Sequence, residues 1–510
     1  MANPITNSLR LAHAGLTLAR YDALLPPDQL AKAPWFARLG MKLAQFGSRR
    51  DPEGGQHNHL TAALSKLGPS YIKLGQFLAT RPDMIGAKRA FELKALQDRL
   101  PPFPQDEALA VIEAELGKPV RILFKSFGPP VAAASIAQVH KAVTFDGRNV
   151  AVKILRPGVE RRFANDIESF AFAARMAERF STEGRRLRPV GAVAMLEDSM
   201  VQELDLRMEA AALSEMMQNA KDDPGFRVPA VHWELSAKRV LTTEWIDGTS
   251  MADVLALKAR GLDLHALGDT VIQSFLRHAI RDGFFHADMH QGNLFVDAGG
   301  NLVALDFGIT GRLSEADRLF LAEILYGFIT RNYRRIAQVH FDAGYVPPTE
   351  DMETFAQALR AIGEPIMGLP ADQISMSRLL TQLFEVTEQF NMQTQPQLLL
   401  LQKTMVVTEG VARTLNPDLN IWKSGEPVVK HWLERKLGPL GKIEQAIGTT
   451  RTLSGLALRV PKLVNEAHEF HGKLDRFIEL QNRPANPWPT RLLAICAVAL
   501  VCIAVTLVVR

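Results

Sequence analysis

The stretch HADMHQGNLFV, with the LDFG that follows it, carries the residues best suited to chemistry. His286, Asp288 and Asn293 fill an H-x-D-x-x-x-x-N pattern, and Asp306 begins the D-F-G. Asp306 and Asn293 are the types of side chain that hold a divalent metal against phosphates. Asp288 can orient or deprotonate an attacking hydroxyl or water. In this order the residues predict phosphoryl transfer of the kinase type.

A lysine upstream fits the same chemistry. Lys153 lies in a V-A-V-K strand, where it is expected to contact phosphates, and the stretch QELDLRMEAAAL offers acidic partners for it. On one continuous helix Glu203 and Glu209 point about 120° apart, whereas Asp205 and Glu209 share a face. We therefore expect Glu209 to pair with Lys153 and leave Glu203 and Asp205 for a contact outside the usual kinase core. The alternative is a solvated acidic face with Glu203 paired to Arg207.

The loop before that strand is rich in alanine where a kinase normally has glycine. It consists of Ala132, Ala133, Ala134 and Ser135. Alanine restricts the backbone and adds methyl groups where close approach to phosphates is wanted, so the loop predicts a non-standard pose for the nucleotide. A turn of helix is the alternative. Glu244, in the strand RVLTTEWIDG, is also expected among the nucleotide-binding residues.

A zinc site competes with this interpretation, because His286 and His290 are four residues apart, as in the helix of a zinc protease. Such a helix needs Glu directly after the first His, and here Gly292 ends the segment in a loop. Zinc is therefore not expected. His290 instead takes the place where protein kinases carry a lysine, two residues after the catalytic aspartate.

The N-terminal stretch PSYIKLGQFLATRPD predicts a helix that is capped near Ser70 and stops before Pro82. Its polar stripe contains Lys73, Gln76 and Thr80. Taken alone, the pattern indicates no more than an amphipathic helix.

Together these residues resemble one family, the UbiB/ADCK atypical kinase-like proteins that support ubiquinone (coenzyme Q) biosynthesis. The likeness covers roughly residues 60–435. It rests on K-x-G-Q (Lys73, Gly75, Gln76), the alanine-rich loop, Lys153, E-x-D (Glu203, Asp205), Glu209, Asp288, Asn293 and Asp306.

The resemblance implies an α+β, bilobal protein-kinase-like fold that binds ATP and Mg²⁺. It also implies that the K-x-G-Q helix covers the place of a protein substrate, with Glu203 or Asp205 as the partner of Lys73. The expected activity is that of an ATPase acting on or with membrane lipids and prenylated quinone precursors. Its expected partners are other ubiquinone-biosynthesis enzymes, and a homodimer is left open as the oligomeric state. Two rivals remain open: a small-molecule or lipid phosphotransferase, and a nucleotide-binding scaffold without turnover.

Composition narrows the class of protein further. The 510 residues are 47% hydrophobic and 22% charged, with a net charge of +4, as in ordinary globular chains. No basic concentration with exposed aromatics is evident, so nucleic acid is not an expected partner. The two cysteines, Cys496 and Cys502, lie in the last apolar run, which leaves no disulfide framework and fits a reducing compartment.

Residues 492–509 hold no charge. A helix of this length spans about 27 Å, close to the roughly 30 Å hydrocarbon core of a bilayer. Ten basic residues between Arg435 and Arg491 precede the span and Arg510 alone follows it. The asymmetry predicts a single C-terminal transmembrane helix in a bacterial inner membrane, or an equivalent organelle membrane, with the body on the cytoplasmic side.

The pattern of turns and strands predicts the organisation of the chain. Helices are expected in the extension, strands in the first lobe around RILFKSFG, the hairpin HKAVTFDGRNVAVKIL and RVLTTEWIDG, and helices again in the second lobe. A long helical insertion, at about 160–220, is expected within the first lobe. The expected domains are the extension 1–120, a kinase-like N-lobe 121–248, a helical C-lobe 249–435, a linker 436–487 and the anchor 488–510.

Overall fold

The computed structural model describes residues 4–21, 59–79, 81–85, 89, 92–93, 96, 100–180, 188–367, 385–386, 389–392 and 396–437. The described chain forms two compact units. The first contains the described residues up to Ala210 together with Val231–Trp245, and the second contains Ala211–Ala230 and the described residues from Ile246 onward. Each unit mixes helices and strands, which makes the fold α+β.

The first unit contains a four-stranded antiparallel sheet in the order β1-β2-β3-β5. Its strands are β1 Ser126–Ala133, β2 Ala137–Val143, β3 Asn149–Leu155 and β5 Val240–Glu244. The predicted turn at Asp146-Gly147 is confirmed between β2 and β3, and Gly147 has the positive φ of +87° that such a turn favours. In β3, Val150, Val152 and Ile154 alternate into the core.

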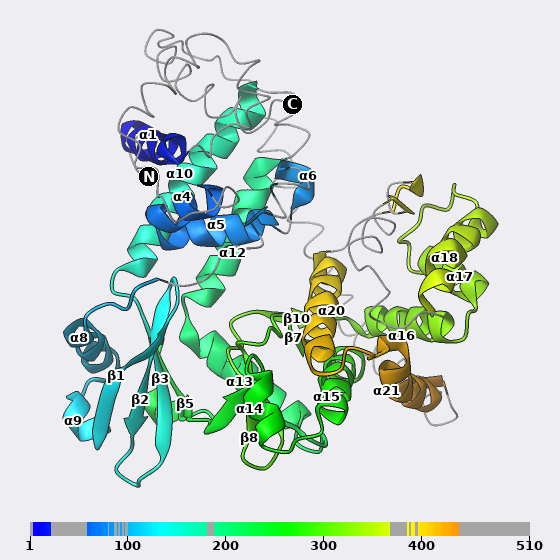
Figure 1. The fold of residues 1–510 in the computed structure, drawn as a ribbon. Coiled ribbons are helices and arrows are strands. Elements are labelled where there is room, and N and C mark those ends of the chain that lie inside the picture. Colours follow the sequence, from blue (N-terminus) through cyan, green and yellow to red (C-terminus); the bar gives the residue numbers. More distant parts are fainter. Residues whose placement is uncertain are drawn as a thin grey trace, which may run out of the picture. The chain divides into compact units, whose positions relative to one another are not determined.

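Two short helices precede this sheet: α8 Gln105–Leu116 and α9 Val120–Leu123 (Figure 1). Ala108, Val111 and Ile112 of α8 pack with the buried valines of the sheet in one core. The prediction of a strand over RILFKSFG was wrong in its first half, because Val120–Leu123 is helical. Pro119 fixes the backbone just before α9, and the Val120 N–H donates to the side chain of Glu113 at 3.1 Å.

The remaining helices of the first unit are α1 Pro4–Arg20, α4 His59–Leu67, α5 Pro69–Ala79, α6 Pro82–Ile85, α10 Val159–Phe180 and α12 Pro189–Glu203. In Figure 1, α4 and α5 lie beside the long helix α10, and contacts join α1, α4, α5 and α10. The helix predicted to be capped near Ser70 starts one residue earlier. Gly68, at φ +100°, ends the preceding segment, and Pro69 opens α5 because its fixed φ suits a first turn.

Helix α13 Leu206–Asn219 begins among residues of the first unit, and its later residues belong to the second. The short η1 turn, Trp233–Leu235, also belongs to the first unit. The other helices of the second unit are α14 Val254–Ala259, α15 Leu264–Arg277, the π-helical η2 His278–Asp282, α16 Glu315–Ile329, α17 Tyr333–Asp342, α18 Met352–Met367, α20 Pro396–Leu415 and α21 Ile421–Leu437.

Short strands in the second unit carry the loops of interest. The predicted hairpin in LFVDAGGNLVALDFG is confirmed as β8 Leu294–Asp297 and β9 Leu302–Ala304. A sheet in the order β4-β9-β8-β6 contains it, with β4 Phe226–Arg227 and β6 Gly248–Ser250. A second, two-stranded sheet pairs β7 Phe284–His286 with β10 Thr310–Arg312. Asp288 and Asn293 thus lie between β7 and β8, and Asp306 lies between β9 and β10.

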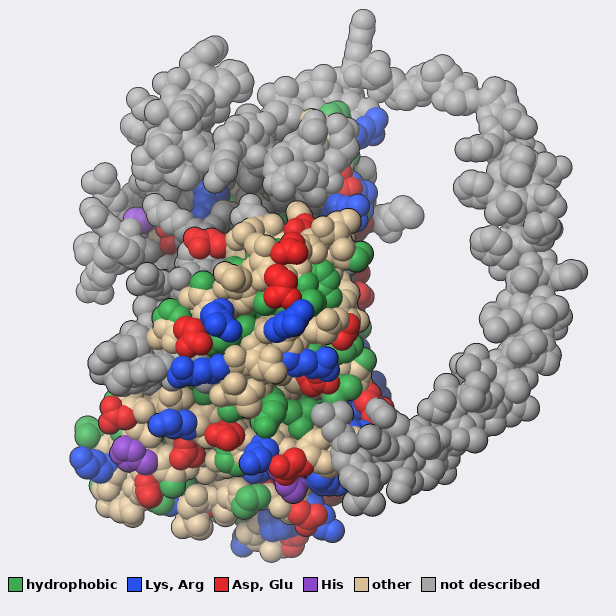
Figure 2. Space-filling model, turned by 90° about the vertical axis from the view of Figure 1, so that its right-hand side faces the viewer, with side chains coloured by type: hydrophobic (Ala, Val, Ile, Leu, Met, Phe, Trp, Pro, Cys, Tyr) green, Lys and Arg blue, Asp and Glu red, His purple; other side chains and the backbone are tan. Residues whose placement is uncertain are grey.

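The predicted anchor, residues 492–509, lies outside the described residues. Within the part of the chain that the structure describes, no helix combines the length and the apolar character needed to cross a bilayer. On the coloured part of the face in Figure 2, acidic and basic side chains are interspersed.

Candidate active site

Lys153 of β3 pairs with Glu209 of α13. The lysine Nζ donates to Glu209 Oε1 at 2.9 Å and to Oε2 at 2.8 Å, and the two side chains are 17% and 7% exposed. β3 lies between β2 and β5, so its backbone is fixed on both sides. The predicted choice of Glu209 as the partner is confirmed. The two hydrogen bonds to a buried carboxylate hold the Lys153 ammonium group in one orientation.

The single helix assumed for Glu203 through Glu209 was wrong. Helix α12 ends at Glu203, and α13 begins at Leu206. Asp205 caps α13, since its Oδ1 accepts the N–H of Arg207 at 3.1 Å, and it also forms an ion pair with the Arg207 guanidinium. This capping and pairing hold the pKa of Asp205 below its usual range despite its partial burial. Asp205 therefore makes a local contact, and the alternative pairing of Glu203 with Arg207 is wrong as well.

Glu203 instead contacts the K-x-G-Q helix. Lys73 Nζ of α5 lies 2.6 Å from Glu203 Oε2 of α12, and both side chains are 9% exposed. Gly75 lets α5 pack closely, because a Cβ there would lie 2.6 Å from Leu96 Cδ2. Gln76 lies half-buried on the next part of the helix. Of the two partners considered for Lys73, the structure selects Glu203.

The alanine-rich loop is a hairpin connection. Ala132 and Ala133 end β1, where they pair with Val139 and Gln138 of β2, so the alternative of a helical turn is wrong. The N–H of Ala134 donates to the carbonyl of Ala137 at 2.8 Å. That amide is consequently engaged within the hairpin. A glycine-rich loop would offer its amides to phosphates.

Arg156, which directly follows β3 of the same sheet, fixes the alanine-rich loop by hydrogen bonds to its backbone. Its Nε and Nη2 donate to the carbonyl of Ala134 at 3.0 and 2.9 Å, and Nη2 also reaches the carbonyl of Pro101 at 2.8 Å. Sequence reasoning missed this residue. The sequence shows only an arginine three positions after Lys153, just past the strand. The carbonyl groups that accept its hydrogen bonds lie 22 and 55 residues away in the sequence. Ser135, the last residue of the loop, is buried, and Glu244 ends β5 opposite Val150.

In the second unit, His286 joins the two loops that carry the candidate catalytic residues. Its Nδ1 accepts the N–H of Asp288 at 3.0 Å, so Nε2 carries the proton and donates to the carbonyl of Leu305 at 2.9 Å. Burial lowers the pKa of His286, which keeps the ring neutral in this tautomer. The ring also packs on Phe307 of D-F-G at 4.6 Å between centroids. Because both ring nitrogens are engaged, His286 has no lone pair left for zinc.

Asn293 and Asp306 fit a divalent cation. The Asn293 amide Nδ2 donates to the carbonyl of Asp288 at 3.1 Å, which leaves its Oδ1 as the acceptor end. The Leu305 N–H donates to the Asn293 carbonyl at 2.8 Å, so the two loops are joined next to Asp306. Asp306 itself adopts a left-handed backbone with φ of 57°, a strained conformation typical of functional positions. One carboxylate and one amide oxygen are ligands that Mg²⁺ accepts.

His290 is oriented toward Asp288. Its Nδ1 accepts the N–H of Gly292 at 3.0 Å, so the neutral ring carries its proton on Nε2, which lies 3.5 Å from Asp288 Oδ2. His290 stands two residues after Asp288, at the sequence position where protein kinases carry a lysine. His290 can thus place a hydrogen-bond donor near the carboxylate.

Among the ion pairs of the second unit that were not predicted, one lies on the strand that follows D-F-G. Arg312 of β10 forms two hydrogen bonds with Glu215 of α13, at 2.8 and 2.6 Å. The pair connects the strand that follows D-F-G to the helix that begins just before Glu209. Both side chains are solvent-accessible, so the pair contributes little to stability on its own.

Comparison with known proteins agrees with this geometry. Residues 95–340 match the ABC1 atypical kinase-like domain, and residues 359–420 match the UbiB helical domain. The chain is 39% identical over 470 residues to the "Probable protein kinase UbiB" of Marinobacter nauticus, covering 91% of this chain and 85% of the relative. It is 40% identical over 445 residues to the protein of the same name from Azotobacter vinelandii, covering 86% and 82%.

A solved structure has a similar fold. It is a complex of Rv3197 with erythromycin from Mycobacterium tuberculosis, with a TM-score of 0.50 and 25% identity, and the match covers 79% of this chain and 98% of that one. The Lys153–Glu209 pair, the loops joined by His286 and the relatives' similarity over most of both chains lead to one assignment. The chain belongs to the UbiB family of atypical kinase-like proteins and has a kinase-like α+β fold.

Proposed function

We propose that the chain is an ATP- and Mg²⁺-dependent atypical kinase or ATPase that supports ubiquinone biosynthesis. The observation that carries the proposal is the pair of loops in the second unit, in which His286 fixes Asp288 on one loop and Leu305, next to Asp306, on the other. This arrangement preorganises a carboxylate for the attacking group and oxygen ligands for a metal. Preorganised electrostatic groups are the main protein contribution to phosphoryl transfer.

Each residue has a distinct task in this proposal. Lys153, held by Glu209, contacts the phosphates of ATP, and Asp306 with the Oδ1 of Asn293 holds the metal. When bound, Mg²⁺ would supply positive charge to offset the charge that develops on the phosphates. Asp288 accepts the proton of the attacking hydroxyl or water, or orients it, with the His290 Nε2 nearby as a donor.

The Lys73–Glu203 pair favours a substrate other than an ordinary protein. Both charges are nearly buried, and breaking such a pair costs more than breaking an exposed one. The K-x-G-Q helix is therefore fixed to α12 within the first unit. We propose that this helix restricts access by protein substrates, and that prenylated phenols or membrane lipids are acted on instead.

We further propose that residues 492–509 tether the protein to a bacterial inner membrane with its body on the cytoplasmic side. The support is the uncharged run of the sequence and the excess of basic residues before it. Deleting residues 488–510 should move the protein from the membrane fraction to the supernatant after a high-salt wash while nucleotide binding persists. A truncated protein that stays fully with the membrane would exclude a single anchor.

Nucleotide binding and phosphate release by the purified full chain test the central proposal. Turnover is measured with and without a phenolic quinone precursor and anionic vesicles, and the fate of the γ-phosphate is followed with labelled ATP. Release to water supports the ATPase, and transfer to the phenol or lipid would favour a small-molecule phosphotransferase. If the full chain binds nucleotide but releases phosphate no faster than the Asp306→Asn variant, the protein is a scaffold and the enzymatic proposal is overturned.

A further inference from the structure

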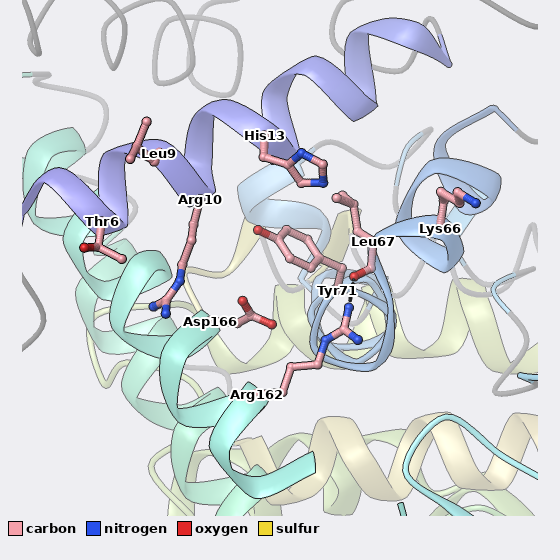
Figure 3. A pocket seen from close by; sticks show the side chains of 9 residues that line it. All are labelled: Thr6, Leu9, Arg10, His13, Lys66, Leu67, Tyr71, Arg162 and Asp166. Atoms are coloured by element: carbon pink, nitrogen blue, oxygen red, sulfur yellow. Dashed lines mark hydrogen bonds between the residues drawn. The ribbon is translucent and has the colours of Figure 1, made fainter. Parts of the chain in front are cut away.

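A cavity in the first unit has none of the candidate catalytic residues in its lining. It is lined by residues of α1, α4, α5 and α10, as Figure 3 shows, and has a volume of about 390 Å³. Sites for small ligands typically measure about 300–1,000 Å³, so this one is large enough for a small molecule or a headgroup. The cavity lies at the start of α5, close to the K-x-G-Q sequence.

The charges that line the cavity are mostly positive. Arg10 of α1, Lys66 of α4 and Arg162 of α10 are three permanent cations, whereas Asp166 of α10 is the one carboxylate among the lining residues. Within the described chain, the structure gives none of the three cations an ion-pair partner. Three positive charges against one negative charge leave an excess of two, which favours an anionic occupant.

Two of these cations are held in place by backbone carbonyls. Arg162 Nη2 donates to the carbonyl of Leu67 at 2.6 Å, and Arg10 Nη1 donates to the carbonyl of Asn165 at 3.2 Å. Gly68 leaves the space for Arg162, because a Cβ there would lie 2.3 Å from Nη2. A guanidinium has five N–H donors, so each arginine retains donors for a ligand.

Tyr71 adds a neutral donor to the cavity. Its ring packs edge-on against Phe170 at 5.0 Å between centroids, which fixes its direction. Burial, together with the charge of Asp166, raises the pKa of Tyr71 above its ordinary value. The phenol therefore keeps its proton and can donate a hydrogen bond. Leu9 and Leu67 supply an apolar part of the lining.

We propose that this cavity binds the phosphate group of a phosphate ester, with Arg10, Lys66 and Arg162 as the cationic contacts and Tyr71 as a donor. Fixed guanidinium groups match phosphate oxygens in geometry as well as charge. The apolar lining of Leu9 and Leu67 suits the carbon chain of such an ester. The phosphate can come from a soluble ester or from a lipid headgroup, and binding experiments distinguish these sources.

The full chain in detergent micelles is titrated with glycerol 3-phosphate by calorimetry. In a second arm, the chain is incubated with phosphatidylglycerol vesicles and with phosphatidylcholine vesicles, and the excess bound to phosphatidylglycerol is measured. Lys66→Gln and Arg10→Gln each replace one cationic side chain of the cavity lining by a neutral one. Arg161→Gln is the matched control, since Arg161 is exposed on α10 and does not line the cavity. Lys153→Ala tests whether the probe binds at the nucleotide site instead.

We expect saturable binding in at least one arm, weakened at least about tenfold by Lys66→Gln and by Arg10→Gln. Arg161→Gln and Lys153→Ala should leave this affinity unchanged. Binding of glycerol 3-phosphate identifies a soluble ester as sufficient, and binding to phosphatidylglycerol alone identifies the lipid headgroup. Absence of saturable binding in both arms, or equal affinity in all four variants, would overturn the proposal. Unchanged thermal unfolding of the variants excludes misfolding as the cause of lost binding.

Discussion

Lys73 Nζ lies 2.6 Å from Glu203 Oε2, and this ion pair joins the K-x-G-Q helix to the end of α12. The two residues are far apart in the sequence, and both side chains are almost buried. Asp205, only two residues beyond Glu203, pairs instead with exposed Arg207 and caps α13. Glu203 and Asp205 therefore have different partners although they are two residues apart. Comparing variants of the two residues can separate their contributions to stability.

Glu203→Gln should destabilise the first unit by about 3 kcal/mol, because it leaves the buried charge of Lys73 without its carboxylate. Asp205→Asn is the control and should cost less than about 1 kcal/mol, since asparagine also caps helices and the lost ion pair is partly exposed. Urea unfolding of the two variants and of the double variant Lys73→Met/Glu203→Gln measures the difference. The double variant should be more stable than Glu203→Gln alone. Equal losses in Glu203→Gln and Asp205→Asn would contradict a special role for the buried pair.

Asp306→Asn should lower ATP turnover by about 100-fold or more while the protein remains folded. Asparagine tolerates the left-handed backbone at this position better than most residues, so the substitution removes charge without adding strain. Turnover and thermal unfolding are measured on the same preparations. Asp306→Val, which is disfavoured at a positive φ, is expected to lose stability as well as activity. Full turnover by Asp306→Asn would remove this carboxylate from the mechanism.

Ala134→Gly should bind ATP more tightly and gain phosphorylation of the protein itself, with loss of support for ubiquinone synthesis. Glycine removes the methyl group and permits backbone conformations in which the loop amides can turn toward phosphates. Nucleotide affinity, incorporation of labelled phosphate and quinone content of complemented cells are the three measurements. Ala151→Gly, in the neighbouring strand, serves as the control for added backbone freedom. If Ala134→Gly matched the wild type in all three, the loop would act only as a packing turn.

The network around Asp223 in the second unit should make stability depend on acidity. The side chain of Asp223 is only 2% exposed. Although burial alone raises its pKa, the hydrogen bonds from His278 and Arg281 outweigh burial and lower the pKa below the usual range. The unfolded carboxyl has a pKa of about 3.9, so the stabilisation is complete above this value and is lost as the pH falls further toward the folded value.

Asp223→Asn should accordingly cost about 3 kcal/mol at pH 7 and less at pH 3. Urea unfolding midpoints of the wild type and the variant, followed across this range, provide the measurement. The difference between the two proteins should narrow only in the acid range. A constant difference at every pH would show that the charge of Asp223 is not involved.

The local sequence pattern predicted much of the candidate site, because many of the residues of the site are close together in the sequence. The loop with Asp288 and Asn293, the hairpin leading to Asp306 and the β2–β3 turn all depend on short-range chemistry and were found by their residue types. Glu209 was chosen correctly as the partner of Lys153, although the single helix assumed for Glu203 through Glu209 was wrong.

The features that were missed depend on contacts between distant segments. The break between α12 and α13 is stabilised by the Leu206 N–H, which donates to the carbonyl of Lys238 at 2.9 Å, as well as by the Asp205 cap. The helical periodicity of the sequence continues across this break and therefore does not predict it. The pairing of Lys73 with Glu203 was foreseen only as one of two choices, since side-chain direction across two helices is not encoded in either sequence stretch.

Arg156 sets a limit on where the sheet of β1, β2, β3 and β5 can be separated from the rest of the chain. Its guanidinium is shared between the carbonyl of Ala134 and those of Leu100 and Pro101. A fragment that begins at residue 121 would retain every strand of the sheet but would deprive Arg156 of two acceptors. Without these two acceptors the Arg156 guanidinium would no longer be fixed, and neither would the alanine-rich loop that it contacts. Nucleotide affinities measured on that fragment would therefore not represent the intact protein.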